Sequence, residues 1–310
     1  MSITALPRYS SLEEALVSLF GAGVKMVRSE RISGGDINDA FRLRLSDGSS
    51  IFMKSNNKRN MSFFTAEAAG LNAIRQTGAI GTPHLLCCGT DEGRGGISFL
   101  LMEFITGESR AENYWEIFAR QLVKMHCAMT GQFVVKGKYG FSSDNYIGSG
   151  PQVNNVHDTW IDFYRECRLE PQFKWAEHYF SPMEKKKIVR LLDHLEDFLI
   201  EPGQPSLLHG DLWSGNVITG NDGRAWLIDP AVYVGHAEAD IAMTELFGGF
   251  PGEFYAAYKE AAYETHCEIQ PGYDERRDLY NLYQLLNHLN LFGRTYFSSV
   301  KQIVNRYITS

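Results

Sequence analysis

The sequence predicts an α+β protein with two lobes: a small antiparallel sheet with one key helix, followed by a larger, mainly helical lobe. The division rests on a change in the hydrophobic period. Up to about residue 105, short runs alternate apolar and polar side chains between turn-forming Gly, Asp and Ser residues, which is typical of strands. From Asn113 onward, apolar residues recur every three or four positions, as on the buried face of a helix. We therefore place an N-terminal lobe at residues 1–105 and a C-terminal lobe at residues 106–310.

The first lobe is expected to combine one sheet with a short opening helix and a longer central helix. Ser11 and Glu14 have capping-box spacing, so a helix should begin there and run through Phe20. A second helix should begin at Met61, because the apolar residues after it recur with helical spacing. Alternating or apolar runs between turn residues predict the strands: residues 27–32, 41–45, 50–54, 85–89 and 97–105.

The second lobe is expected to be mostly helical around one short hairpin. Its first helix should span about residues 113–129, because apolar side chains up to Met129 share one helical face. Residues 138–151 are rich in Gly, Ser and Asn, which predicts a loop. Apolar stripes predict the remaining helices near residues 160–167, 188–198, 238–247, 253–265 and 275–292.

The most informative stretch is residues 209–216, His-Gly-Asp-Leu-Trp-Ser-Gly-Asn. Asp211 and Asn216 have the H-x-D-x-x-x-x-N spacing of a kinase catalytic loop. An apolar hairpin with an Asn-Asp-Gly turn follows and should return Asp229 toward Asn216. Phosphoryl transfer needs one group that orients the attacking hydroxyl and oxygen ligands for Mg²⁺. Asp211 is therefore the candidate base, and Asn216 and Asp229 are the candidate Mg²⁺ ligands. The alternative, a chance polar turn before a hairpin, requires all of these features to coincide.

A second constellation is expected in the first lobe. Lys54 ends a strand, and Glu67 falls on the apolar stripe of the following helix. A carboxylate on a buried face needs a partner, because an isolated buried charge is costly. Lys54 is the natural partner, and in kinases such a pair holds the α- and β-phosphates of ATP. The alternative is a Glu67 that reaches water from the edge of the stripe and a Lys54 on the surface.

Two backbone segments would complete an ATP site. A loop that begins at Ser33, Gly34 and Gly35 lies between two expected strands, where a kinase places its phosphate-covering hairpin. The loop lacks G-x-G-x-x-G and is a weak signal by itself. The end of the last strand would be the hinge that binds the adenine edge through the backbone of Glu103, Phe104 and Ile105. A plain core strand that ends in a turn is the alternative at this position.

The composition of the chain argues against some classes of binding partner and some cellular locations. Of the 310 residues, 44% are hydrophobic and 22% are charged, which are globular values. The net charge of −7 argues against nucleic acid as a partner. No apolar run reaches the length of about 18 residues that a membrane helix needs, and the first residues lack the features of a signal peptide. Five cysteines, an odd number without metal-ligand spacing, favour a reducing cytoplasm.

These residues resemble those of the fructosamine kinases (ketosamine-3-kinases), within the aminoglycoside-phosphotransferase-like, protein-kinase-like fold. The resemblance covers about residues 27 to 293 and is carried by Trp213-Ser214-Gly215 after His-Gly-Asp and by residues 33–38, 67–71, 228–233, 235–240, 246–250 and 286–293. It implies ATP-dependent phosphorylation of the 3-hydroxyl of a ketoamine, on a protein or a small amine. The 3-phosphate is unstable and eliminates, which frees the amine.

The resemblance also assigns roles. Asp211 would be the base, Asn216 and Asp229 would hold Mg²⁺, Lys54 would bind phosphate, and Glu67 would orient Lys54. The loop that starts at Ser33 would cover the phosphates of ATP. The segment from Glu103 to Ile105 would bind adenine.

Two further side chains are candidates for contact with the substrate. Trp213 either stacks on the sugar or braces the catalytic loop from the core. His288 lies on the polar shoulder of a Leu-rich helix, where a structural role is the alternative. Asp240 is expected to accept backbone N–H bonds from the catalytic loop, and His209 is expected to brace that loop.

Two other functions stay open at this point. One is a kinase of the same fold that acts on an amino alcohol, an amino sugar or an aminoglycoside-like antibiotic. The segment from Trp213 to Gly215 favours the ketoamine over these acceptors. The other is a pseudokinase that binds without turnover. It is disfavoured by the intact set of Lys54, Glu67, Asp211, Asn216 and Asp229.

Overall fold

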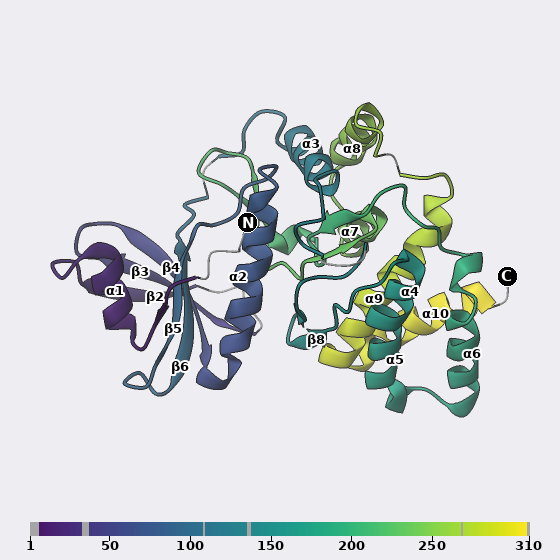
Figure 1. Cartoon of the computed structure of the whole chain (residues 1–310), viewed down its shortest axis with the longest axis horizontal. Coiled ribbons are helices and arrows are strands. Elements are labelled where there is room, and N and C mark those ends of the chain that lie inside the picture. Colours follow the sequence, from purple (N-terminus) through teal and green to yellow (C-terminus); the bar gives the residue numbers. More distant parts are fainter. Residues whose placement is uncertain (1–5, 33–36, 108, 135–137, 268, 309–310) are drawn as a thin grey trace.

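A six-stranded sheet and helix α2 form the N-terminal lobe (Figure 1). Its elements are β1 (Arg8–Tyr9), α1 (Leu12–Phe20), β2 (Met26–Ile32), β3 (Asp39–Leu45), β4 (Ser50–Asn57), α2 (Met61–Gln76), β5 (Leu85–Asp91) and β6 (Ile97–Glu103). The computed structural model describes residues 6–32, 37–107, 109–134, 138–267 and 269–308. The strand order is β1-β5-β6-β4-β3-β2, and every pair is antiparallel except the edge pair β1–β5.

The two faces of this sheet bury different helices because successive side chains of a strand point to opposite sides. On β6, Phe99 and Leu101 belong to the apolar cluster that contains Leu12 of α1. Leu100 and Met102 belong to the cluster that contains Phe64 of α2. A strand covered on both faces needs a continuous apolar run, which explains the sequence of residues 97–102.

Helix α2 lies between its own sheet and the C-terminal lobe (Figure 1). A Cβ atom added at Gly70 would lie 3.1 Å from the Pro230 ring and 3.2 Å from the Val232 side chain. The absence of a side chain at Gly70 therefore lets the segment that follows Asp229 pack directly against α2. This contact sets the distance between Glu67, one helical turn earlier, and the hairpin of the second lobe.

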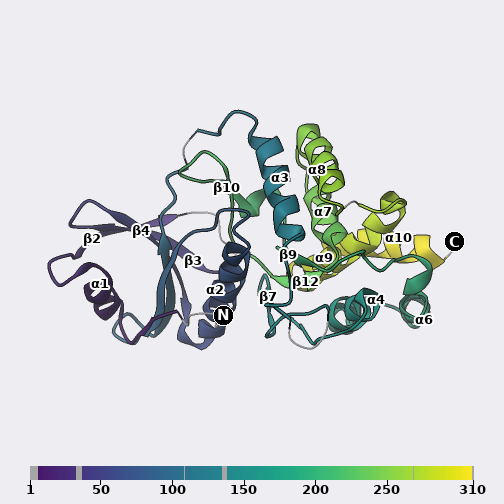
Figure 2. The same ribbon diagram turned by 45° about the horizontal axis from the view of Figure 1, so that its top comes forward.

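The C-terminal lobe is mainly helical, and several two-stranded pairings run through it (Figure 2). Its elements are α3 (Tyr114–His126), β7 (Asn145–Ile147), β8 (Gly150–Gln152), α4 (Trp160–Tyr164), α5 (Glu170–Trp175), α6 (Pro182–Leu192), β9 (Ser206–Leu208), β10 (Val217–Thr219), β11 (Ala225–Leu227), β12 (Tyr233–Gly235), α7 (Ala237–Leu246), α8 (Gly252–Glu264), α9 (Tyr273–Phe292) and α10 (Phe297–Ile308). The antiparallel pairs are β7–β8, β9–β12 and β10–β11. Among the described residues, no helix is both long and apolar enough to cross a bilayer.

Two expectations for this lobe were wrong. Helix α3 ends at His126 rather than near residue 129, because the chain turns at Cys127, and Met129 is 88% exposed. The predicted loop at 138–151 contains hairpin β7–β8. Two polar side chains of this hairpin are buried rather than solvated: Asn145 and Gln152 donate to the carbonyls of Val232 and Ala231, at 2.7 Å and 2.9 Å. The hairpin thus braces the segment that follows Asp229.

Element ends also differ from the sequence prediction. The last strand of the first lobe stops at Glu103 rather than at Ile105. Helix α6 ends at Leu192, although the apolar stripe predicted a helix through Phe198. Helix α10 and the pair β9–β12 were not predicted. The pair β9–β12 is short and joins segments distant in the chain, so local periodicity carries little information about it. Helix α10 does have an apolar stripe at helical spacing, Val300, Ile303, Val304 and Tyr307, which the sequence prediction missed.

Two of the five cysteines are joined. Cys127, after α3, forms a disulfide with Cys267, after α8. Cys87, Cys88 and Cys167 are buried thiols, as expected for the first two from their apolar run. An odd number of cysteines was therefore poor evidence for a reducing compartment, because it did not exclude a pair.

Helix α7 makes the stability of the protein sensitive to pH. His236 is its N-cap: Nδ1 accepts the N–H of Glu238, and burial among aromatic rings lowers the pKa of His236 to about 4. The unfolded chain binds this proton below about pH 6.5, whereas the folded chain does not, so stability falls as the pH drops from about 6.5 toward 4. We expect a loss of about 2 kcal/mol between about pH 7 and pH 5 in urea unfolding.

The variant His236→Asn separates this titration from the cap. Asn is a good N-cap residue but does not titrate in this range. Its free energy of unfolding should therefore change with pH by about 2 kcal/mol less than that of the parent chain. The same pH slope in both proteins would show that the titration of His236 does not account for it.

Candidate active site

Three charged side chains from the two lobes meet at one point. Nζ of Lys54, on β4, lies 2.6 Å from Oε1 of Glu67, on α2, so the predicted contact is present. The same ammonium contacts Oδ1 of Asp229, which follows β11. Only about a tenth of the Lys54 and Glu67 side chains is exposed. The alternative of a solvated Glu67 and a surface Lys54 is therefore wrong.

The electrostatics of this group favour an added cation. Burial opposes the charge on Lys54, but the carboxylates of Asp229 and Glu67 outweigh it and raise the pKa of Lys54. Burial also raises the pKa of Glu67 to about 7, although Lys54 opposes that shift. One ammonium is thus shared by two carboxylates, and the surplus negative charge can be offset by a metal ion.

Asp229 has an unusual backbone. Its φ angle of 54° lies in the left-handed region, where a residue other than Gly is uncommon, although Asp is one of the better tolerated. Burial works against ionisation, but the Lys54 ammonium lowers the pKa of Asp229 below its ordinary value. The side chain remains 43% exposed, so a ligand can reach the carboxylate. Such local strain is typical of functional sites.

The hairpin returns Asp229 to Asn216 as predicted. Val217 pairs with Leu227 across β10–β11, and the N–H of Ile228 donates to the carbonyl of Asn216 at 3.1 Å. This last bond extends the pairing to the residue before Asp229. The two candidate Mg²⁺ ligands are therefore held at the open end of one hairpin.

Asp240, on α7, fixes the backbone of the catalytic loop. Its carboxylate accepts the backbone N–H groups of His209 at 2.7 Å and of Gly210 at 2.9 Å, as expected from the sequence. His209 braces the loop, because its Nε2 bonds the carbonyl of Ile228 and its Nδ1 accepts the N–H of Asp211. Gly210 has φ of 82°, and a Cβ atom there would lie 2.1 Å from the carbonyl oxygen of Ala231. A side chain at Gly210 would therefore displace this loop.

Asp211 and Asn216 lie within one hydrogen-bonded turn. Nδ2 of Asn216 donates to the Asp211 carbonyl at 2.8 Å and to Oδ2 of the Asp211 carboxylate at 3.2 Å. Burial raises the pKa of Asp211 to about 7; the bond from Asn216 opposes the shift, and the charges of Asp229 and Asp240 add to it. A carboxylate with such a pKa can accept a proton near neutral pH.

Asn216 and Asp229 fit a magnesium ion. Asn216 uses its amide nitrogen for both bonds to Asp211, so its amide oxygen is the atom that can bind a cation. Asp229 already contacts the Lys54 ammonium, which shows that its carboxylate is oriented to accept positive charge. Amide and carboxylate oxygens are ligands that Mg²⁺ prefers, usually completed by water and phosphate. In the described part of the chain, no cluster of three His, Cys, Asp or Glu side chains offers another metal site.

The expected hinge is tied to the second lobe. The Glu103 carboxylate accepts the backbone N–H of His84 at 3.2 Å and the side-chain amide of Asn221 at 3.3 Å. Asn221 lies in the β10–β11 turn, and its Oδ1 accepts the backbone N–H and the hydroxyl of Thr106. Arg42 covers the Phe104 ring at 4.5 Å. The hinge segment through Ile105 is thus connected to the hairpin that carries Asp229.

The three candidate residues of the phosphate loop, Ser33, Gly34 and Gly35, lie outside the described residues. The end of that loop is anchored by Asn56 of β4, whose side-chain amide donates to the Ile37 carbonyl at 3.1 Å and to Oδ1 of Asn38 at 2.7 Å. Asn56 is two residues from Lys54. The chain therefore leaves the loop directly beside the strand that carries the candidate phosphate-binding lysine.

Trp213 and His288 belong to one group of aromatic rings. Phe247 connects them, with ring centroids 6.5 Å from Trp213 and 4.8 Å from His288. Trp213 is 38% exposed, which excludes a purely core role. Its ring also lies over Gly215, where an added Cβ atom would be 2.3 Å away. Nδ1 of His288 bonds the Gln284 carbonyl, which leaves Nε2 as the nitrogen that can face a ligand.

Several residues that support the site carried no sequence prediction. Gln284 of α9 donates to the Gly210 carbonyl at 2.9 Å, and Asn221 connects the hinge to the hairpin. Asn145 and Gln152 hold the backbone after Asp229. Each acts through a bond to a backbone group far away in the sequence. The only local signal is an uncharged amide inside an otherwise apolar or Gly-rich stretch.

Comparison with known proteins agrees with this geometry. The sequence model of the fructosamine kinase family matches residues 9–310. The chloroplastic protein-ribulosamine 3-kinase of Oryza sativa subsp. indica is 40% identical over 292 residues, which cover 93% of this chain and 81% of that protein. The crystal structure of a presumed fructosamine-3-kinase from Haemophilus somnus 129PT superposes with a TM-score of 0.81 at 29% identity and covers 96% of each chain.

A more distant structure supports the fold alone. A mutant of aminoglycoside phosphotransferase APH(4)-Ia, crystallised with AMP-PNP and hygromycin B, has a TM-score of 0.62 at 17% identity and covers 97% of this chain and 98% of that one. The two-lobed protein-kinase-like fold and the resemblance that the sequence indicated are both confirmed. The chain belongs to the fructosamine kinase family.

Proposed function

We propose that the protein transfers the γ-phosphoryl group of ATP to the 3-hydroxyl of a ketoamine, with Mg²⁺ as cofactor. The observation that carries the proposal is the meeting of Lys54, Glu67 and Asp229 between the lobes, beside the Asp211–Asn216 turn. Phosphoryl transfer depends mainly on positioning and on stabilisation of charge, and this group supplies both. Membership of the fructosamine kinase family supports a ketoamine acceptor.

On the nucleotide side, Lys54 is the residue for the phosphates. Glu67 holds its ammonium in place at 2.6 Å, so a phosphate can replace Asp229 as the second partner of the ammonium. Asp229 and Asn216 would then hold Mg²⁺, which supplies neutralisation of the phosphate charge. The backbone of residues 103–105 would bind adenine, and the loop that includes Ser33, Gly34 and Gly35 would cover the phosphates.

On the acceptor side, Asp211 would orient the 3-hydroxyl and accept its proton as the new P–O bond forms. Asn216 holds the carboxylate in place through its amide nitrogen. Trp213, two residues from the base and partly exposed, would stack on the sugar part of the ketoamine. His288 would present Nε2 to the same substrate across Phe247.

The consequence of this reaction would be deglycation. A ketoamine 3-phosphate loses phosphate by elimination, so the original amine is released. The acceptor is a glycation adduct on a protein or on a small amine. The cytoplasmic location expected from the sequence stays a prediction.

A substrate panel tests this proposal. Fructosamine, ribulosamine and erythrulosamine adducts of one amine would be compared at equal concentration, with ADP formation as the readout. The matched control is the corresponding amino alditol, which has a 3-hydroxyl but no keto group. We expect turnover of at least one ketoamine and none of the alditol. Turnover of an aminoglycoside or an amino alcohol in preference to every ketoamine would contradict the proposal.

Glu67→Gln tests the positioning of Lys54. The amide cannot hold the ammonium as firmly as the carboxylate, and hydrogen bonds to charged groups contribute about 1.5–3 kcal/mol. We therefore expect the KM for ATP to rise roughly 10- to 100-fold. Glu92→Gln is the matched control, because Glu92 pairs with Lys58 in the same lobe but on the surface. An equal KM in the Glu67 variant and the parent chain would show that Glu67 does not position Lys54 for ATP.

A further inference from the structure

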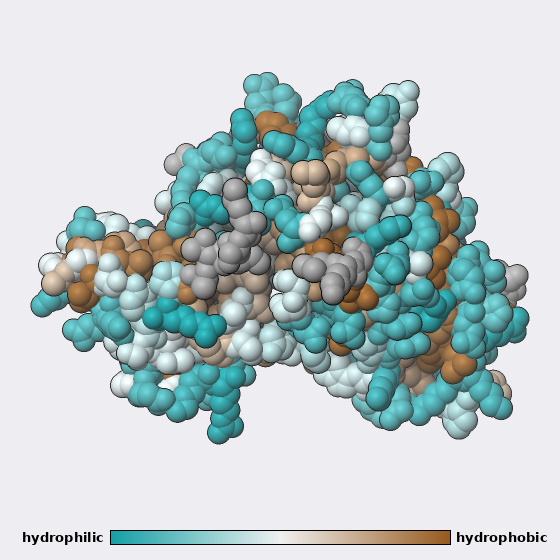
Figure 3. Space-filling model, viewed as in Figure 1, coloured by the Kyte–Doolittle hydropathy of each residue, from teal (hydrophilic) through white to brown (hydrophobic). Residues whose placement is uncertain are grey.

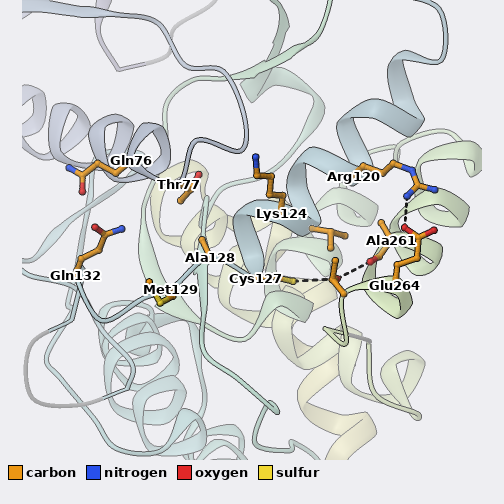
Figure 4. Close-up of a pocket in the computed structure, with 12 residues that line it drawn as sticks. Gln76, Thr77, Arg120, Lys124, Cys127, Ala128, Met129, Gln132, Ala261 and Glu264 are labelled. Atoms are coloured by element: carbon orange, nitrogen blue, oxygen red, sulfur yellow. Dashed lines mark hydrogen bonds and ion pairs between the residues drawn. The ribbon is translucent and has the colours of Figure 1, made fainter.

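A concave site is lined by residues other than those of the candidate active site (Figure 4). It is a cavity of about 600 Å³ between the end of α2, helix α3 and the end of α8. Its lining includes Gln76, Lys124, Cys127 and Gln132. Cavities of roughly 300–1,000 Å³ are typical of small-molecule sites. None of the residues assigned above to the phosphoryl transfer lines this cavity.

The cavity gives access to one half of the disulfide. Cys127 is among the lining residues, whereas its partner Cys267 is not. The Thr265 hydroxyl lies 3.6 Å from the Cys127 sulfur. That hydroxyl donates to the Ala261 carbonyl at 2.8 Å. A nucleophile in the cavity would therefore meet the Cys127 sulfur first.

The Cys267 sulfur is the better leaving group of the two. Nε2 of Gln204 donates to Sγ of Cys267 at 2.7 Å. A hydrogen bond to sulfur stabilises the thiolate, and a sulfur whose thiolate is stabilised is the better leaving group in thiol–disulfide exchange. The two ends of the disulfide thus differ: Cys127 is open to attack, and Cys267 carries the donor that stabilises a leaving group.

The walls of the cavity indicate the class of nucleophile. Arg120 is neutralised by Glu260 and Glu264, at 2.6 Å and 2.7 Å. Lys124 instead bonds a neutral acceptor, the Gly78 carbonyl, at 3.2 Å, so its charge is available to an anion. The side-chain amides of Gln76 and Gln132 add uncharged hydrogen-bonding groups. This set suits a small peptide thiol that carries carboxylates, such as glutathione.

We propose that Cys127–Cys267 is a thiol–disulfide exchange site for a low-molecular-weight acidic thiol bound in this cavity. The thiolate of the ligand attacks Sγ of Cys127, the Cys127–Cys267 bond breaks, and Cys267 leaves as a thiolate that takes up a proton. The product is a mixed disulfide on Cys127. A second thiol molecule attacks the ligand sulfur of that mixed disulfide, which releases the oxidised ligand and Cys127 as a thiolate. The reverse steps, with the disulfide form of the ligand as oxidant, restore the cross-link.

The remaining cysteines do not compete. Cys87, Cys88 and Cys167 are buried, and burial raises the pKa of each of these thiols. A buried thiol of raised pKa contains little of the reactive thiolate. Exchange is therefore confined to the pair beside the cavity.

The disulfide is connected to the catalytic loop through His126 and Asp240. His126, adjacent to Cys127, is buried and contacts Oδ2 of Asp240 at 3.2 Å through Nε2 and the Tyr258 hydroxyl at 2.7 Å through Nδ1. Asp240 in turn holds the backbone of His209 and Gly210. Opening the disulfide removes the covalent tie at the end of α3. We expect the turnover number to fall roughly 3- to 30-fold, the range of measured couplings through such networks.

Mass spectrometry tests the exchange without reference to catalysis. The oxidised full-length protein would be mixed with glutathione, quenched with acid and digested, so that the mixed disulfide can be located. We expect glutathione on Cys127. In the variant Cys267→Ser, where Cys127 is a free thiol, glutathione disulfide is the reagent: Cys127 attacks it, one glutathione leaves as a thiolate, and the mixed disulfide should accumulate because no Cys267 thiol can displace it. The variant Lys124→Gln should slow the reaction with glutathione by about tenfold but leave that with the neutral thiol 2-mercaptoethanol unchanged.

Two results would overturn this inference. One is the absence of a glutathione adduct, or an adduct on Cys267 to the same extent as on Cys127. The other is an equal effect of Lys124→Gln on glutathione and on 2-mercaptoethanol. The link to catalysis has its own test. The double variant Cys127→Ser/Cys267→Ser should have the lowered turnover number and no response to glutathione. Equal turnover in the oxidised and reduced parent protein would contradict that link. The adduct can be measured even if no ketoamine is phosphorylated, so this test and that of the proposed function fail independently.

Discussion

Replacing Asp211 with Asn is expected to lower the turnover number about 10³-fold, within the range of about 10² to 10⁴ for general base catalysis. The amide keeps the shape and the contact with Asn216 but cannot take the proton of the acceptor hydroxyl. The pKa of Asp211, which burial raises to about 7, shows how strongly this carboxylate differs from an ordinary surface acid. Steady-state kinetics with a ketoamine and ATP would measure the change, and the KM for ATP should stay nearly constant.

The matched control is Asp274→Asn, since Asp274 is an exposed carboxylate at the start of α9, with 85% of its side chain accessible. That variant should keep the parent turnover number. If Asp211→Asn retained more than about a tenth of the parent turnover, Asp211 would not be the base.

Asp229→Asn is the second change with a large expected effect. It removes the charged metal ligand and one of the two partners of Lys54, while the 2.6 Å contact between Lys54 and Glu67 remains. Charge stabilisation by a bound metal is worth several kcal/mol, so we expect the turnover number to fall about 10³-fold at equal Mg²⁺. The fold should persist, because the side chain is 43% exposed and the Lys54–Glu67 pair still joins β4 to α2.

A titration with Mg²⁺ distinguishes metal binding from a general loss of structure. The variant should need a much higher Mg²⁺ concentration for half-maximal turnover, and its unfolding transition should match that of the parent chain. Asp222→Asn, in the same hairpin but at its exposed turn, is the control and should leave the Mg²⁺ dependence unchanged. An unchanged dependence in Asp229→Asn would assign the metal to other residues.

The parts of the site that the sequence predicted are those with short or regular spacing. Asp211 and Asn216 are five residues apart, and a hairpin of ordinary composition returns Asp229 to them, so local rules suffice. The Lys54–Glu67 pair also follows from local patterns, because a charged residue on an apolar helix stripe needs a partner nearby. These features are determined by the chain close to each residue.

The supporting bonds could not be predicted in this way. Gln284 reaches the Gly210 carbonyl, and Asn145 reaches the Val232 carbonyl, across 74 and 87 positions of the chain. A Gly- and Asn-rich stretch predicts a loop whether its polar groups face water or buried carbonyls, which is why hairpin β7–β8 was missed. The Cys127–Cys267 pair likewise joins residues 140 positions apart. Such contacts depend on how whole elements pack.

The position of the phosphate on the product decides whether the protein is a ketoamine 3-kinase. A ketoamine labelled with ¹³C at C3 would be incubated with ATP, Mg²⁺ and the enzyme, and the product would be followed by ³¹P and ¹³C NMR. We expect a phosphorus signal coupled to the labelled carbon, followed by release of free amine and inorganic phosphate. A phosphate on any other oxygen, or ADP formation without phosphorylated ketoamine, would contradict it.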